Sequence, residues 1–174
     1  MRDLSWTAAA MLAAAGTWLA ATGTTPAGPA LTGVRSGAEL DALEARVSHA
    51  PNDHTALVQL TDEYLSQGAP GLAAASLERA PEPVKERAVV ADAHARALTE
   101  LGNATVALDA QKKALRACAE QGCSRSIVAR GERRLRVLSE MVRLGVQDHL
   151  LEPNRALIAY RIAVREVALE HSSQ

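Results

Sequence analysis

Two cysteines are the residues of this chain whose spacing could support redox or metal chemistry. Cys118 and Cys123 are separated by Ala-Glu-Gln-Gly. A structural zinc site takes four ligands, and no second cysteine or histidine pair lies nearby. A haem attachment site needs two intervening residues and a following histidine, which this spacing does not provide. In an oxidising compartment the pair predicts a disulfide joining the end of one helix to the start of the next, with two free thiols as the alternative.

Histidines and carboxylates are the other candidates for chemistry. The five histidines are scattered along the chain, and none belongs to a His-Glu-x-x-His pair. His94 falls at a core-like position, so we expect either a packed, hydrogen-bonded histidine or a group that lines a binding pocket. The glycines fall at turns, and the carboxylates stand beside Lys and Arg on helix faces. The sequence therefore predicts a protein that is not an enzyme and that uses no metal or cofactor.

The composition indicates which elements must position these side chains. Ala and Leu dominate the apolar residues, Phe is absent, and Trp and Tyr occur only twice each. Ala and Leu are strong helix formers and poor strand formers. No segment alternates β-branched and aromatic residues with period two. The predicted fold class is all-α, with small side chains that let helices approach closely.

The N-terminal segment carries a targeting pattern. Arg2 is followed by an apolar run from Leu4 to Ala21, and no charge occurs between Leu4 and Val34. A basic start followed by such a run predicts, over residues 1–23, either a cleaved signal peptide or an uncleaved membrane anchor. Residues 24–35 are small and rich in Pro and Gly, which is typical of a linker. We expect residues 36–171 to be exported into the cell envelope, periplasmic or membrane-anchored with the N-terminus inside, and residues 172–174 to form a tail.

The middle of the chain repeats itself with a period of 34 residues. The first copy consists of seven residues, Leu57, Leu60, Tyr64, Gly68, Ala73, Leu77 and Ala80. The second copy, each member displaced by 34, is Ala91, His94, Leu98, Gly102, Ala107, Gln111 and Ala114. Glycine can adopt the left-handed conformation that ends a helix, and alanine leaves room where two helices meet. The pattern predicts two helical hairpins that turn at Gly68 and Gly102.

This pattern resembles the tetratricopeptide repeat (TPR) family, whose period is also 34 residues. The resemblance implies a short array of stacked antiparallel hairpins whose first helices line an inner face. It further implies partner-binding positions on that face, namely Val58, Asp62 and Leu65 in the first repeat and Asp92, Arg96 and Thr99 in the second. The family's clamp for a peptide carboxylate needs clustered basic and Asn side chains, which these positions lack. A protein or peptide partner, with basic character to match Asp62 and Asp92, therefore fits this face best.

The segments around the two copies extend the pattern less regularly. Ser36 and Glu39 form a capping box for a helix that ends near His49, and Asp53 can cap the next helix. Near the C-terminus a last helix is expected after Pro153, with Ala156, Tyr160 and Ala163 at the spacing of a second repeat helix. Its partner helix contains Gly131, where we expect the helix to start or bend.

Charge is distributed unevenly along the chain. Residues 36–110 hold five basic and twelve acidic side chains, whereas residues 111–143 hold nine basic and three acidic ones. These charges are either solvated helix faces or a basic patch for a charged partner. No aromatic side chains interleave with the basic residues, so nucleic acid is not the predicted ligand. The leading hypothesis is a protein-interaction or scaffold module. A structural self-association element and a small-molecule binder or enzyme with a pocket near His94 are the alternatives.

Overall fold

The computed structural model describes the backbone of residues 37–172 and the side chains up to residue 165. The expected signal or anchor over 1–23, the linker over 24–35, Ser36 of the capping box and the last two residues lie outside the described residues. Within the described part, no helix combines the length and the apolar character needed to cross a bilayer.

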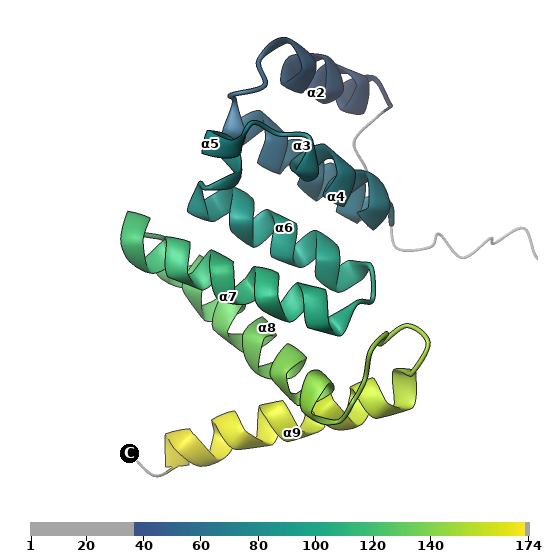
Figure 1. Ribbon diagram of the computed structural model, residues 1–174, viewed down its shortest axis with the longest axis vertical. Coiled ribbons are helices and arrows are strands. Elements are labelled where there is room, and N and C mark those ends of the chain that lie inside the picture. The colour runs from purple at the N-terminus through teal and green to yellow at the C-terminus, as the bar shows by residue number, and fades with distance from the viewer. Residues whose placement is uncertain (1–36, 173–174) are drawn as a thin grey trace, which may run out of the picture. The chain divides into compact units, whose positions relative to one another are not determined.

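Helices account for all the regular structure between residues 37 and 172 (Figure 1). They are α2 (Gly37–His49), α3 (His54–Ser66), α4 (Pro70–Glu78), α5 (Glu82–Lys85), α6 (Ala88–Glu100), α7 (Ala104–Gln121), α8 (Arg125–Arg143) and α9 (Pro153–Ser172). No strand occurs in this range, where the β-type pairing is a single isolated bridge between Asn103 and Asp148. The all-α prediction is confirmed.

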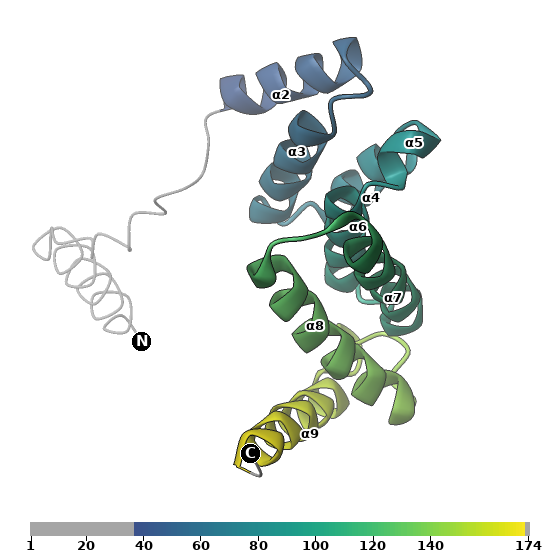
Figure 2. The same cartoon turned by 90° about the vertical axis from the view of Figure 1, so that its left-hand side faces the viewer.

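Successive helices pack on one another along the chain. α3 packs on α4, α6 on α7, and α8 on both α7 and α9, while α6 also contacts α3 and α4. Two views at right angles place α2 and α9 at opposite ends of this stack (Figures 1 and 2). α6 therefore lies in the middle, with neighbours on several sides.

The two predicted glycine turns have the backbone conformation that the sequence suggested. Gly68 follows α3 with a φ of 69°, and Gly102 follows α6 with a φ of 94°. Side chains other than glycine are strained in this left-handed region. The helices that follow α2 and α6 begin with side-chain caps, because Asp53 accepts a hydrogen bond from the N–H of Ala56 and Asn103 accepts one from Val106.

The core has one main cluster near the N-terminal end and another nearer the C-terminal end, and both combine alanines with larger apolar side chains. Leu57, Leu60, Tyr64 and Leu77 are buried together with residues of α2 and α6. Ala73 and Ala107 are fully buried, as expected for residues at close helix contacts. Tyr64 also donates a hydrogen bond of 2.7 Å to Glu44 Oε1, which joins α3 to α2. Burial and this acceptor raise the pKa of Tyr64 to about 12.

The C-terminal helices differ from the sequence-based expectation in two respects. α8 begins at Arg125 and runs through Gly131, so the expected helix start at that glycine is wrong. Ala156 and Ala163 are buried against α8 as predicted, but Tyr160 between them is half exposed, at 50%.

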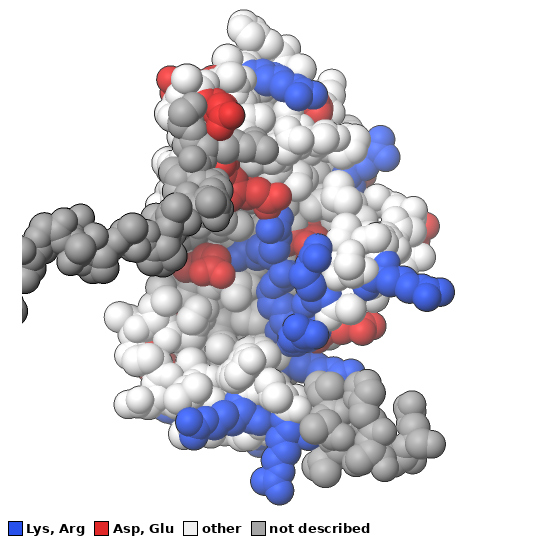
Figure 3. All heavy atoms as spheres, turned by 180° about the vertical axis from the view of Figure 1, so that it is seen from behind, with Lys and Arg blue, Asp and Glu red and all other residues white. Residues whose placement is uncertain are grey.

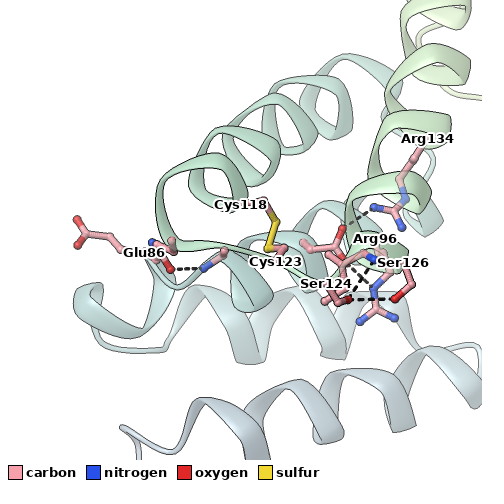
Figure 4. Close-up of a disulfide and its surroundings, with 11 residues drawn as sticks. Glu86, Arg96, Cys118, Cys123, Ser124, Ser126 and Arg134 are labelled. Carbon is pink, nitrogen blue, oxygen red and sulfur yellow. Dashed lines mark hydrogen bonds and ion pairs between the residues drawn. A yellow bond between two sulfur atoms is a disulfide. The ribbon is translucent and has the colours of Figure 1, made fainter.

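Cys118 and Cys123 form a disulfide, which confirms the prediction (Figure 4). The Cα atoms lie 5.0 Å apart, within the range that a disulfide spans. The bond links the last turn of α7 to the residue before the N-cap of α8, and Gly122 between them has a φ of 80°. It therefore fixes how α8 leaves α7.

Candidate functional site

The structure brings together three of the six positions that the repeat pattern assigned to partner binding. Arg96 of α6 forms an ion pair of 2.6 Å with Asp62 of α3 and a longer one of 3.7 Å with Asp92 on its own helix. Val58 and Leu65 are partly buried against the N-terminal core. Thr99 donates its hydroxyl hydrogen bond to the carbonyl of Ala95. These six residues therefore interact chiefly with each other and with the fold.

A residue from the basic helix α8 completes this arrangement. Arg134 Nη1 lies 3.1 Å from Asp92 Oδ1 and also donates a hydrogen bond to Gln111 Oε1 of α7. We call Asp62, Asp92, Arg96, Gln111 and Arg134 the ion-pair cluster. Seen from behind, Lys and Arg side chains gather on this face with acidic side chains beside them (Figure 3). Figure 4 draws Arg96 and Arg134 among the residues in the surroundings of the disulfide, with dashed lines for their interactions.

The ion-pair cluster corrects one expectation. Asp92 was expected to be exposed on an inner face, but it is only 7% exposed. Its carboxylate is covered because α8 crosses near α6 and supplies Arg134. A buried carboxylate with two arginines is already neutralised, so it is a poor recognition site for a basic partner.

Gly131 explains how α8 comes so close to α7. A Cβ atom at this position would lie 2.9 Å from Gln111 Nε2 and 3.0 Å from Leu115 Cδ2. Real Cβ atoms essentially never make contacts shorter than 3.0 Å, so an added Cβ would require the Gln111 and Leu115 side chains to shift. The glycine places Arg134, one turn further along α8, next to Gln111 and Asp92.

A groove opens on another side of α6, and we call it the His94 groove. Its cavity of about 480 Å³ is floored mainly by apolar side chains, Leu77, Val90, Ala91, Leu98, Val106 and Ala110, together with His94. Charged side chains line its edges, namely Glu78, Lys85, Asp109, Lys113 and Arg116. The groove exists because Ala91 and His94 occupy positions that hold leucine in the first repeat.

His94 is the polar group of this floor. It is half-buried, and its Nε2 atom is buried without a hydrogen-bond partner among the described residues. Burial lowers the pKa of His94 below its ordinary value, with Lys113 and Lys85 acting in the same direction and Glu78 against them. The ring is therefore neutral near pH 7 and can offer one nitrogen to a bound group. The expected packed, hydrogen-bonded histidine is replaced by one that lines a groove.

The charged edge of the His94 groove is more basic than acidic. Asp109 lies 3.7 Å from Lys112 and Lys85 lies 3.4 Å from Glu82, which leaves Lys113 and Arg116 against Glu78. A neighbouring depression of about 500 Å³ shares Lys113 and Arg116 with the groove. An apolar floor beside two shared cations suits a ligand that combines an apolar side chain with a carboxylate.

Among the described residues, no three His, Cys, Asp or Glu side chains gather around one point. No family model, no curated protein and no solved structure matches this chain.

Proposed function

We propose that this chain is a protein-binding module of the cell envelope, built from TPR-like hairpins, and that a partner protein inserts an apolar side chain into the His94 groove. The observation that carries this proposal is the groove itself, a cavity of about 480 Å³ with an apolar floor. Binding sites in proteins have volumes of roughly 300–1,000 Å³ and a few well-placed polar groups among apolar ones. His94 is the neutral polar residue among the apolar side chains that line this groove.

The charges at the edge define the partner further. Lys113 and Arg116 border both the groove and the neighbouring depression, so a carboxylate next to the anchoring side chain would face two cations. Edge charges of this kind set partner choice and association rate more than affinity. The partner segment is therefore apolar at its centre and acidic at its flank.

The ion-pair cluster and an enzymatic role for His94 have less support than protein binding at the His94 groove. Recognition at Asp62 and Asp92 would have to displace Arg96 and Arg134 from their carboxylates. An enzyme built around His94 would need a nucleophile or an orienting group bonded to the ring, and Nε2 has no such partner among the described residues. Location in the envelope rests on the apolar N-terminal run, and the disulfide is consistent with an oxidising compartment.

Site-specific photocrosslinking tests the proposal. A photoreactive amino acid replaces either Val106, which lines the groove and is 46% exposed, or Leu72, which lies outside the groove and is 57% exposed. We expect a protein adduct from position 106 and none from position 72. The double change Lys113→Glu with Arg116→Glu should suppress the adduct, whereas Lys112→Glu on the same helix should not.

Other patterns of crosslinking would point elsewhere. An adduct that survives the double change but is lost on Asp62→Lys would move recognition to the ion-pair cluster. If the photoreactive residue at position 106 forms an adduct only with a small molecule, the His94 groove is a metabolite site and the protein-binding proposal fails.

A further inference from the structure

Exposed large apolar side chains are concentrated at the α9 end of the stack. Nine large apolar residues among those described are exposed, and six of them lie after residue 149. Three follow one stripe of α9 at helical spacing, Leu157, Tyr160 and Val164, and are 44–50% exposed. A soluble chain normally turns such residues inward, and a group of them at one place marks a contact surface.

The stripe borders a second groove, the α8–α9 groove. Its volume is about 260 Å³, and its lining consists of Arg133, Arg136, Val137, Tyr160, Ala163 and Val164. The apolar part comes from both helices, whereas both cations come from α8. Arg161 and Arg165 are exposed on α9 itself. The occupant of this groove must therefore be apolar or small where it touches the floor and acidic beside it.

The α2 end of the same stack combines small apolar side chains with acidic ones. α2 packs on α3 through Leu40, Leu43 and Val47. Its opposite side, the α2 outer face, consists of Ala38, Asp41, Ala42 and Ala45, all exposed. α2 carries Asp41 on this face and Glu39 beside it, whereas Glu44 accepts the hydrogen bond from Tyr64 and Arg46 is paired with Asp53 at 2.7 Å. One end is thus small and acidic, and the other is bulky and basic.

We propose that copies of this chain associate head to tail, with the α2 outer face of one copy seated on the α8–α9 groove of the next. Bulky residues of α9 meet alanines of α2, and the arginines meet carboxylates. Pairing two α8–α9 ends would instead place arginines against arginines, so a two-fold dimer through this surface is disfavoured. In stacked helical repeats each unit contacts only its neighbours, and terminal units stay soluble when their outer face is polar. The described part of α9 exposes the apolar stripe of Leu157, Tyr160 and Val164, and a second copy covers it. This contact is independent of the His94 groove.

Complementary variants test the direction of the contact by sedimentation velocity of the full chain. The tail variant combines Tyr160→Asp with Val164→Asp, and the head variant combines Asp41→Arg with Ala42→Arg. All four positions are exposed, so the helical circular dichroism should not change. The unmodified chain should form a concentration-dependent series of oligomers, since a contact between two different surfaces leaves a free end after each addition. Each variant alone should be monomeric.

An equimolar mixture of the two variants decides between head-to-tail and two-fold association. The head variant keeps an intact α8–α9 groove, and the tail variant keeps an intact α2 outer face. One copy of each should therefore bind the other, which gives a dimer and nothing larger. Raising the salt concentration should weaken this dimer. Leu72→Asp, also an exposed apolar residue but on α4, should leave the series unchanged. An unmodified chain that stays monomeric at its highest soluble concentration overturns the proposal. The proposal is also overturned if the unmodified chain forms a discrete dimer that the tail variant abolishes and the head variant does not, because such a dimer does not use the α2 outer face.

Discussion

The two repeats use equivalent positions in opposite ways. In the first hairpin Leu57, Leu60 and Leu77 are at most 3% exposed and fill the space between helices. The positions 34 residues later hold Ala91, His94 and Gln111. Ala91 and His94 line an open groove, and Gln111 is fully buried but accepts a hydrogen bond from Arg134.

This difference shows that the two copies can share the same turn and helix contacts although large apolar side chains are replaced at three equivalent positions. Both copies keep the turn glycine and the buried alanine at the helix contact, Ala73 or Ala107. The second copy replaces leucine by smaller or polar residues, which leaves a groove on one side of α6 and a polar contact to α8 on another. The first copy therefore fills these positions with buried leucine, whereas the second uses them to line a groove and to bond Arg134.

The largest effect should come from the interior of the first hairpin. Leu57→Ala removes a side chain that is 2% exposed and should cost about 2–5 kcal/mol of unfolding free energy, since the surrounding helices close the cavity only partly. Urea denaturation followed by circular dichroism measures this cost. The matched control is Leu72→Ala, because Leu72 is 57% exposed and its loss should change stability by less than about 0.5 kcal/mol. Equal midpoints for the two variants would contradict the filling of this interior by Leu57.

A smaller effect is expected where the second repeat meets α8. Arg134→Met leaves Gln111 and the buried carboxylate of Asp92 with fewer partners and should cost about 1–3 kcal/mol. Asp62→Asn breaks the ion pair with Arg96 at an exposed position and should cost less than about 1 kcal/mol. Thermal or urea melts of both variants at the same salt concentration test the ranking. A larger loss for Asp62→Asn would show that the cluster is held from α3 rather than from α8.

The smallest effect concerns the pH dependence contributed by His94. Burial holds the pKa of His94 below its ordinary value of 6.5, so the unfolded chain binds a proton at this residue more readily than the folded chain. Stability therefore decreases as pH falls below 6.5 towards the folded pKa, and Glu78 only partly offsets this. His94→Leu should remove this contribution, so the variant gains stability relative to the parent between pH 7 and pH 5. Unfolding curves that stay parallel across this range would mean that the ring is solvated.

Local and periodic features of the fold could be predicted from the sequence. The composition predicted helices, the 34-residue period located the turns at Gly68 and Gly102, and the short spacing predicted the bond between Cys118 and Cys123. Each of these depends on residues close in the chain or on a repeated pattern. The short helix α5 after Pro81 was missed, because one helical turn has no detectable periodicity.

The contacts of α8 could not be predicted in the same way. Arg134 lies 42 residues from Asp92, and their meeting depends on the crossing of two helices that no repeat places in register. The period therefore indicated an exposed Asp92 where the structure has a buried one. Gly131 was the available signal, since a glycine within a helix indicates either a break or a close approach, and here it allows the approach.

The cysteine content has a consequence for how the chain matures. Cys118 and Cys123 are the two cysteines of the whole sequence, so only one intramolecular pairing exists. Chains with four cysteines have three possible pairings and depend on reshuffling to reach the correct one. This chain has no wrong internal bond to undo, and its partners are five residues apart. Oxidation is therefore a single local event that needs a source of oxidising equivalents but no isomerase.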